Sequence, residues 1–235
     1  MKGIKLVVFD FDQTLVDTLK GFSKAFSEIK KEFQQFLDMN GYNIIVEDYS
    51  SELKETMREL DKNREYDRNN WWNPLLKQLK VTELQFTKDE CEQLTKIYWD
   101  VTSTNTELFP DTLEILNYLK QKKYLLGLVT DNDGGFGLKK IRLAKSPIVK
   151  LFNQVVIAGD DVPEKKPHPA AFQKLTALLK ISPKACVMVG DKPFTDIAGG
   201  KAAGFHTVLV IRDVWEIKPQ PDFQIYQLTE LKALL

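Results

Sequence analysis

The sequence is poor in cysteine, with only Cys91 and Cys186 among its 235 residues. Small secreted domains that depend on disulfide bonds use cysteine far more densely. Cys186 lies in an apolar, strand-like run, which suits a buried free thiol. We therefore expect a reducing, cytoplasmic setting for this protein.

An excess of charge of either sign is also missing, because Lys plus Arg and Asp plus Glu both number 33. A formal net charge of zero provides no global field to attract nucleic acid or an anionic membrane. No apolar run approaches the ~20 residues that a membrane-spanning helix needs. The sequence does not start with a basic region followed by an apolar run, so we expect no signal peptide. We expect neither nucleic-acid nor membrane partners.

What is present is a globular composition, with 43% hydrophobic and 28% charged residues. From about Leu108 onward, helical patterns alternate with short β-branched runs. This alternation predicts an α/β fold with a doubly wound, parallel, Rossmann-like sheet that helices cover on both faces. The predicted strands span residues 6–9, 124–130, 153–159, 185–190 and 206–211, the predicted helices span 110–123, 135–145, 168–180 and 194–204, and residues 222–226 and 228–235 close the chain.

Residues 16–107 lack this alternation. Phenylalanine recurs at helical spacing within residues 17–39, and residues 48–63 and 87–102 also have amphipathic helical patterns. We interpret the region as a helical domain inserted between the first and second strands of the sheet. The predicted domains are therefore an α/β core, formed by residues 1–15 and 108–235, and a helical cap formed by residues 16–107.

Polar residues follow three of the predicted parallel strands and one further loop. Open α/β sheets bind ligands at the carboxyl ends of their strands, so these residues are candidates for a common site. They are Asp10 and Asp12, then Thr130, Asp131 and Asn132, then Lys165 and Lys166, and finally Asp191 and Asp196.

Such a set of side chains favours phosphoryl transfer. Several carboxylates in one crevice repel each other unless a cation joins them, and oxygen ligands without nearby cysteine suit Mg²⁺. A lysine adds positive charge for a phosphate, and a threonine hydroxyl with neighbouring backbone N–H groups donates to its other oxygens. One aspartate can then attack phosphorus, while a second protonates the leaving group and later activates water.

Four segments in this order resemble the motifs of the haloacid dehalogenase-like hydrolase superfamily: DFDQT (10–14), TDN (130–132), KKPHP (165–169) and GDKPFTD (190–196). The resemblance covers the predicted core. The insertion directly after the first motif is similar to the helical cap of the phosphoglycolate phosphatase-like branch. The resemblance therefore implies the same fold and a phosphatase activity.

The resemblance also implies roles for the matched acidic residues. Asp10 resembles the nucleophile and a direct magnesium ligand. Asp12 resembles the general acid and base, and its backbone carbonyl also binds the metal in the family. Asp191 resembles a carboxylate metal ligand, and Asp196 resembles a second one that often acts through water.

The remaining matches concern the phosphate group. Thr130 resembles the phosphate-binding hydroxyl, and Asp131 and Asn132 supply the neighbouring backbone N–H groups. Lys166 matches the family lysine better than Lys165, because a proline follows it directly. Many relatives have Asn or Gly at position 131, so the Asp131 carboxylate must point away if it is not to repel phosphate.

Two further positions depart from the family pattern. Gln13 stands where many relatives have Gly, and Lys192 stands where a small polar residue is common. A pairing of Lys192 with Asp131 or Asp196 is left open by the sequence.

Other conspicuous residues receive structural interpretations. Trp71 and Trp72 are interpreted as cap core rather than as a substrate platform. His168 is interpreted as an exposed residue at the start of a helix rather than as a metal ligand. The basic residues of the 135–145 helix are interpreted as a solvated face, and they are Lys139, Lys140 and Arg142.

The sequence thus predicts a magnesium-dependent phosphatase that hydrolyses a small phosphorylated metabolite through an aspartyl-phosphate, with the cap as a mobile lid. A phosphomutase with the same first step is an alternative, although Thr14 favours a hydrolase because related mutases commonly carry Val there. A dehalogenase is disfavoured because those enzymes lack the second acid, which is Asp12 here. A non-catalytic binding or regulatory module of the same fold is the alternative from another class. The identity of the substrate and the oligomeric state are left open.

Overall fold

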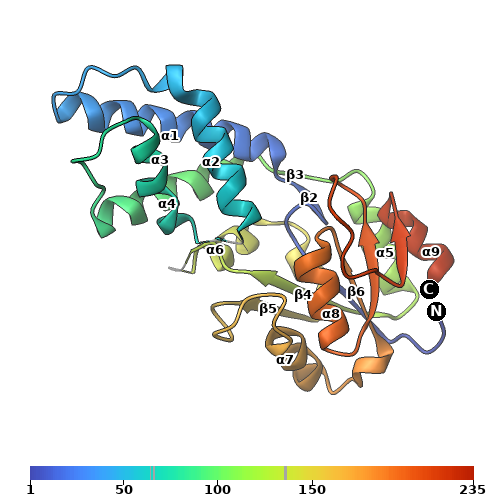
Figure 1. Ribbon diagram of the computed structural model, residues 1–235. Helices are drawn as coiled ribbons and strands as arrows, with labels where there is room; N and C mark the ends of the chain where they lie inside the picture. The colour runs from blue at the N-terminus through green and yellow to red at the C-terminus, as the bar shows by residue number, and fades with distance from the viewer. Residues whose placement is uncertain (64, 66, 135–136) are drawn as a thin grey trace. The chain divides into compact units, whose positions relative to one another are not determined.

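The computed structural model describes residues 1–63, 65, 67–134 and 137–235, and these residues form two compact units (Figure 1). The core unit consists of Met1–Asp17, Glu107–Asn132 and Lys139–Leu235. The helical unit consists of Thr18–Thr106 and Asp133–Leu138. A short segment after Asn132, which the sequence analysis assigned to the core, thus belongs to the helical unit.

The core unit contains a six-stranded sheet whose order is β5-β4-β1-β6-β7-β8, and all of its pairs are parallel. Parallel pairing follows from the helical crossovers between successive strands. The predicted fold class, a doubly wound parallel α/β sheet, is confirmed. The strands are β1 (Leu6–Phe9), β4 (Leu125–Asp131), β5 (Gln154–Ala158), β6 (Cys186–Gly190), β7 (His206–Val210) and β8 (Phe223–Ile225).

Strand β1 lies at the centre of the sheet, and its four residues are all fully buried. Because side chains alternate across a strand, Val7 and Phe9 contribute to one apolar cluster and Leu6 and Val8 to another. An entirely apolar run is therefore required here, as is typical of a parallel strand covered on both faces.

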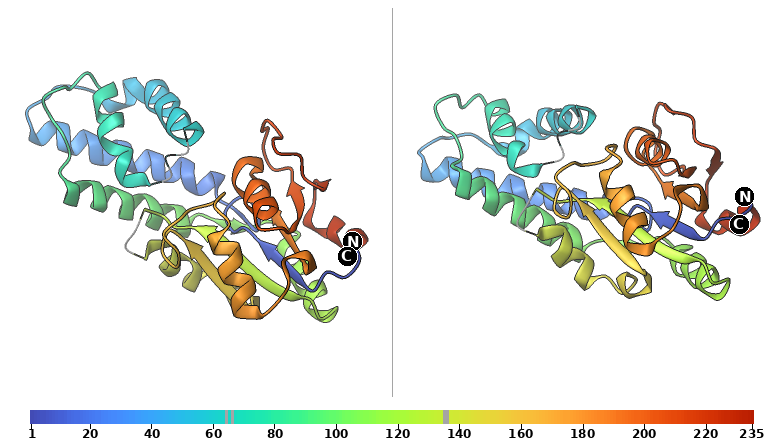
Figure 2. Two further views of the ribbon diagram at one scale, coloured as in Figure 1. Left: turned by 60° about the horizontal axis from the view of Figure 1, so that its bottom comes forward. Right: turned by 90° about the horizontal axis from the view of Figure 1, so that it is seen from below.

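Helices cover both faces of the sheet (Figure 2). Helices α5 (Thr112–Gln121), α6 (Leu138–Lys145) and α9 (Leu231–Leu234) contribute to the cluster that contains Phe9. Helix α7 (Ala170–Leu179) contributes to the cluster on the other face. The helix predicted at 135–145 begins at Leu138 in the structure, and residues 135 and 136 lie outside the described residues.

The segment predicted as one helix from 194 to 204 is divided in the structure. Pro193–Ile197 forms a π-helical turn, and the α-helix α8 spans only Ala198–Ala202. π-Helical turns occur often at functional sites because they re-aim a side chain that a regular helix would place elsewhere. Asp196 lies within this turn.

A two-stranded antiparallel sheet marks the places where the chain leaves and re-enters the core unit. Strand β2 (Val16–Asp17) pairs with β3 (Glu107–Leu108), although the sequence pattern predicted neither. Thr112 strengthens this junction, because its hydroxyl donates to the Leu15 carbonyl over 2.7 Å. The pairing brings the two ends of the long insertion together.

The helical unit contains α1 (Leu19–Met39), α2 (Ser50–Lys62), α3 (Trp72–Gln78) and α4 (Lys88–Thr104). Helix α1 buries Phe26, Ile29, Phe33 and Leu37, whose spacing places them on one face. Helix α4 begins with a capping box, in which Thr87 and Glu90 satisfy each other's backbone N–H groups. Amphipathic helices, rather than sheet pairing, thus hold this unit together.

Trp71 and Trp72 lie in the apolar cluster of the helical unit, where they are 2% and 0% exposed. The Trp72 indole donates to the Thr95 hydroxyl over 2.8 Å. The two cysteines are also buried, and neither forms a disulfide bond. Within the described part of the chain, no helix is both long enough and apolar enough to cross a membrane.

Candidate active site

The carboxyl ends of three neighbouring strands bring the candidate residues together. Asp10 directly follows β1, Asp191 directly follows β6, and Thr130 lies at the end of β4. The β1 strand pairs with β4 on one side and with β6 on the other. Residues that are separated by more than a hundred positions in the sequence therefore share one edge of the sheet.

Three carboxylates form a buried cluster at this edge. Oxygen atoms of Asp10, Asp191 and Asp196 all lie within 4.8 Å of one another, and the residues are 7%, 3% and 1% exposed. Gly190 permits this approach, because a Cβ atom at that position would lie 2.4 Å from the Asp196 side chain. The backbone N–H of Lys192 donates to Asp196 Oδ2 over 3.0 Å and fixes the carboxylate.

Lys166 is the cation of the cluster, and it is only 6% exposed. Its Nζ donates to Asp10 Oδ1 and to Asp196 Oδ1, each over 2.7 Å. Burial disfavours the charged lysine, but the surrounding carboxylates outweigh burial and raise the pKa of Lys166 well above its ordinary value. Lys166 is therefore a stable ammonium in contact with two aspartates.

The Asp131 carboxylate contacts the backbone of the loop that carries Lys166. Its Oδ1 accepts the backbone N–H of Lys166 over 2.9 Å, so it orients the loop that carries the lysine. The side chain of the neighbouring Asn132 donates to Asp160 Oδ1 over 2.8 Å, and its backbone N–H donates to the Ala158 carbonyl over 2.8 Å. Thr130 is 2% exposed at the end of β4.

The charges of the cluster fit a divalent cation. Burial, reinforced by the Asp196 and Asp10 carboxylates, raises the pKa of Asp191 well above its ordinary value. Burial also raises the pKa of Asp10 to about 6, even though Lys166 opposes this shift. One ammonium cannot neutralise three carboxylates, and a dication bound by oxygen ligands would stabilise their ionised forms. The donor set, which consists of oxygen atoms, suits Mg²⁺ better than Zn²⁺.

Thr14 supports the cluster from the first motif. Its hydroxyl donates to Asp191 Oδ1 over 3.0 Å, and the residue is fully buried. The intervening Gln13 has a φ angle of +59°, in the left-handed region that glycine adopts most easily. This conformation explains why a glycine at position 13 would suit the same turn.

Asp12 lies beside the cluster, and its side chain is held by two basic residues of the core unit. Arg142 Nη2 lies 2.6 Å from Asp12 Oδ1, and Lys139 Nζ pairs with Asp12 Oδ2. Burial alone would raise the pKa of Asp12, but Arg142 and Lys139 together hold it well below its usual range. The structure therefore places an ionised carboxylate next to Asp10.

This arrangement corrects the prediction that the basic residues of α6 form a solvated face. Lys140 is exposed, but Lys139 and Arg142 are only 2% and 5% exposed. Residues three positions apart share a helix face, so both side chains can reach one carboxylate. The spacing of Lys139 and Arg142 was visible in the sequence, whereas their target on a distant strand was not.

Together the fold and the cluster define an α/β enzyme with an acidic, lysine-containing site at the carboxyl edge of its sheet. The model of the haloacid dehalogenase-like hydrolase family matches residues 7–210, which is most of the chain. The chain therefore belongs to this family. The predicted family and the predicted enzyme class are both confirmed.

Three relatives of the chain are named as phosphatases. The chain is 28% identical to a glyceraldehyde 3-phosphate phosphatase from Pyrococcus furiosus, over 100% of this chain and 94% of that protein. It is 30% identical to a phosphoglycolate phosphatase from Salmonella typhi, over 88% and 81% of the two chains. It is 27% identical to a pyrophosphatase from Bacillus cereus, over 99% and 96%.

Solved structures of the family share the fold. A phosphatase from Thermococcus onnurineus superposes with a TM-score of 0.72 at 23% identity and covers 98% of this chain and 97% of its own. A hydrolase from Bacillus subtilis gives a TM-score of 0.75 at 21% identity, with coverages of 100% and 99%. At these identities the similarity supports the architecture and says nothing of the substrate.

Proposed function

We propose that this protein is a magnesium-dependent phosphatase that hydrolyses a small phosphorylated metabolite through an aspartyl-phosphate on Asp10. The observation that carries the proposal is the contact of Lys166 with both Asp10 and Asp196 inside the buried carboxylate cluster. The Lys166 ammonium would neutralise part of the charge on a bound phosphate. The neighbouring Asp10 carboxylate could then approach the phosphorus in spite of its own negative charge.

Lys166 and Thr130 are the proposed principal contacts of the phosphate. The Asp131 carboxylate accepts the Lys166 backbone N–H, which supports a backbone rather than a side-chain role for Asp131. A contact from the Asn132 backbone N–H would require its hydrogen bond to Ala158 to break.

Asp10 is the proposed nucleophile. Its carboxylate oxygen forms a bond to phosphorus while the bond from phosphorus to the leaving oxygen breaks, and the leaving oxygen takes up a proton. Water then attacks the phosphorus of the aspartyl-phosphate, which releases inorganic phosphate and restores the Asp10 carboxylate.

Asp12 is the proposed proton donor and acceptor for these two steps. Its contacts with Lys139 and Arg142 favour the ionised form, and this form accepts a proton from the attacking water. Protonation of the leaving oxygen requires Asp12 to gain a proton first, which the two cations oppose.

Asp10, Asp191 and Asp196 would hold the metal, together with the backbone carbonyl of Asp12. Bound Mg²⁺ would neutralise charge on the phosphate oxygens and on the carboxylates. The raised pKa values of Asp10 and Asp191 support this assignment, because they mark a cluster that lacks sufficient positive charge of its own.

The helical unit is the proposed cap that selects the substrate and shields the reaction from water. The relatives named above act on glyceraldehyde 3-phosphate, phosphoglycolate and pyrophosphate, and they support a small phosphorylated substrate. The cytoplasmic location stays a prediction that rests on the two cysteines.

The test is phosphate release from a panel of small phosphate esters, measured with Mg²⁺ and with a chelator. The wild type is compared with Asp10→Asn. The control is Asp222→Asn, which removes an aspartate of the core unit that is not part of the carboxylate cluster. We expect magnesium-dependent release that Asp10→Asn reduces by at least about 10⁴-fold with an unchanged circular dichroism spectrum. Near-normal release by Asp10→Asn would rule out Asp10 as nucleophile, and isomerisation without net phosphate release would indicate a mutase.

A further inference from the structure

A basic pocket lies at the amino edge of the core sheet, opposite the edge that carries the carboxylate cluster. Its volume is about 380 Å³. Lys5 precedes β1, Lys123 precedes β4, and Ile181 lies in the segment that leads to β6. Because the strands of the sheet are parallel, their amino ends meet at one edge and their carboxyl ends at the other. The pocket is therefore separate from the candidate active site.

Three lysines line this pocket, and all three are exposed: Lys5, Lys122 and Lys123. Within the part of the chain that the structure describes, no acidic side chain lines the pocket with them. Among the same described residues, neither Lys5 nor Lys123 has an ion-pair partner. Lys122 Nζ lies 5.7 Å from the centre of the Tyr118 ring, which is an aromatic and not an anionic partner. The pocket thus gathers positive charge without a carboxylate of its own.

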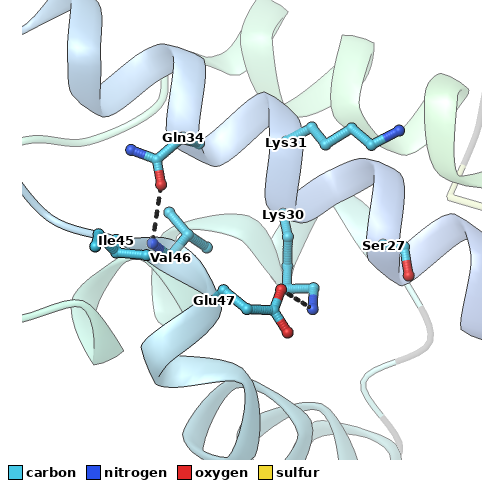
Figure 3. A pocket seen from close by; sticks show the side chains of 7 residues that line it. All are labelled: Ser27, Lys30, Lys31, Gln34, Ile45, Val46 and Glu47. Carbon is cyan, nitrogen blue, oxygen red and sulfur yellow. Dashed lines mark hydrogen bonds and ion pairs between the residues drawn. The ribbon is translucent and has the colours of Figure 1, made fainter.

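A pocket of the helical unit has the opposite arrangement (Figure 3). Lys30 and Lys31 line this space of about 410 Å³, but Glu47 lines it as well. The Glu47 carboxylate lies 2.5 Å from Lys30 Nζ, and Lys31 pairs with Glu28 over 2.8 Å. The lysines of the helical pocket are paired within the chain, so their charge requires no ligand.

The backbone of Lys123 is in a conformation that a side chain disfavours. Its φ angle is +65°, and it directly follows the residue that caps the C-terminus of α5. Glycine adopts this left-handed region most easily and is the usual residue at such a helix end. The helix dipole favours a cation here, but it does not account for Lys5, which lies before the first helix of the chain. An ammonium therefore stands where glycine would suit the backbone better.

Backbone hydrogen bonds hold the lysines in place. The Lys5 N–H donates to the Ala185 carbonyl over 2.8 Å, and the Lys5 carbonyl accepts the Leu125 N–H over 2.9 Å. The Lys123 N–H donates to the Lys120 carbonyl over 2.9 Å. A ligand would therefore order only the side chains of these lysines, which lowers the entropic cost of binding.

The rest of the lining is largely apolar. Ile4 is buried, and Tyr124, Leu125 and Ile181 are half-buried. The Tyr124 hydroxyl donates to the Leu235 carbonyl over 2.8 Å, so it is engaged outside the pocket. Ligand sites commonly combine an apolar wall with a few charged groups that fix the orientation of the ligand.

We propose that this pocket binds a small organic phosphate. Its phosphate group contacts Lys5 and Lys123, because a dianion can be shared between two ammonium groups. Its carbon skeleton packs against Ile4 and Leu125, and this burial favours an organic phosphate over inorganic phosphate. The pocket offers no carboxylate to act as nucleophile or base, so the ligand is bound and not converted. The site is additional to the proposed phosphatase function and does not depend on it.

The probe is phenylphosphonate, a dianion above neutral pH that has an apolar ring and no hydrolysable ester bond. Isotope-labelled protein is titrated in the presence of a chelator at low ionic strength, and backbone amide signals are followed by NMR. We expect saturable shifts at Lys5, Tyr124 and Leu125, with an affinity at least about fivefold higher than for inorganic phosphate. Benzyl alcohol, which lacks the charge, should not produce them. Shifts confined to the signals of Asp10 and Thr130 would overturn the proposal, as would equal affinities for phenylphosphonate and phosphate.

Lys123→Gly is the main variant, because it removes the ammonium and suits the left-handed backbone. Its matched control is Lys80→Gly, since Lys80 has a φ angle of +60° after α3 in the helical unit. We expect Lys123→Gly to weaken binding at the pocket by about 2–5-fold, as the loss of an exposed ion pair predicts, and Lys80→Gly to leave it unchanged.

Lys5→Met provides a second variant that leaves the turn after α5 intact, and we expect it to weaken binding to a similar extent. Phosphate release by the variants should equal that of the wild type, because the lysines lie at the opposite edge of the sheet from the carboxylate cluster. Unchanged affinity in both Lys123→Gly and Lys5→Met would overturn the proposal. An equal loss in Lys80→Gly would also overturn it, because the effect would then reflect net charge and not this pocket.

Discussion

Arg142 in the core unit and Arg68 in the helical unit are almost equally buried, at 5% and 7% exposed. Arg142 contacts the Asp12 carboxylate through two nitrogen atoms, whereas Arg68 is surrounded by the rings of aromatic residues. An opposite charge with good hydrogen-bond geometry offsets more of the cost of burying a charge than aromatic faces do. The difference shows that packing can place a buried arginine either against a carboxylate, as for Arg142, or against aromatic rings, as for Arg68.

The largest effect is expected when Asp12, the carboxylate that pairs with Arg142, is replaced. Asp12→Asn should lower phosphate release by about 10²–10⁴-fold, because the amide can neither take a proton from water nor donate one as a carboxylic acid. Steady-state rates on the best ester of the panel provide the measurement. An unchanged rate would refute the proton-transfer role of Asp12.

The two arginines can also be compared through stability. Arg142→Met should lower the free energy of unfolding by about 1–3 kcal/mol, since Asp12 loses the guanidinium and keeps its contact with Lys139. Arg68→Met should cost about 1 kcal/mol or less, because the lost cation–π contacts are offset by removal of a poorly compensated charge. Urea unfolding followed by circular dichroism measures both. Equal losses of unfolding free energy in the two variants would mean that aromatic rings stabilise a buried guanidinium as much as a carboxylate does.

The smallest effect on the free energy of unfolding is expected at the partly exposed ion pair of Asp222 with Lys201 in the core unit. Burial raises the pKa of Asp222, but Lys201 and the Thr207 backbone N–H outweigh burial and hold it below its ordinary value of 3.8. Ionised Asp222 therefore stabilises the folded state above pH 3.8, and this contribution disappears as the pH falls through the lower pKa of the folded protein.

Asp222→Asn should thus lower the free energy of unfolding near neutral pH by about 0.2–1 kcal/mol, as is usual for a solvent-screened ion pair. The difference between wild type and variant should shrink below pH 3.8. Thermal unfolding at pH 7, 5 and 3 tests this sign. A difference that grows toward pH 3 would contradict the assignment.

Much of the core could be predicted from the sequence because its signals are local. The run Leu6–Phe9 is apolar at every position, which only a strand buried on both faces requires, and the aspartates that follow it lie at a strand end. The lysine before Pro167 was identified by its motif, and its contacts with two aspartates agree with a place at the same edge of the sheet.

Other features depend on contacts between distant residues. Lys139 and Arg142 resemble any surface residues of a basic helix until the fold brings α6 within reach of Asp12, which follows β1 in the chain. The short pairing of β2 with β3 involves only two residues on each side, and no periodicity can reveal a strand of that length. The π-helical turn at Pro193–Ile197 likewise follows from the placement of Asp196 against Gly190 rather than from helix propensity.

The sequence by itself determined the alternation of the central strands with helices, the insertion of a helical unit and the acidic residues at the strand ends, because each is encoded in neighbouring residues. Only the tertiary structure decided which charges are paired. Asp12 acquires two cations, Asp131 supports the Lys166 loop, and Arg68 lies among three aromatic rings. Pairing depends on the positions that packing gives to residues far apart in the chain, and the energy of a buried charge depends on those positions more than on residue type.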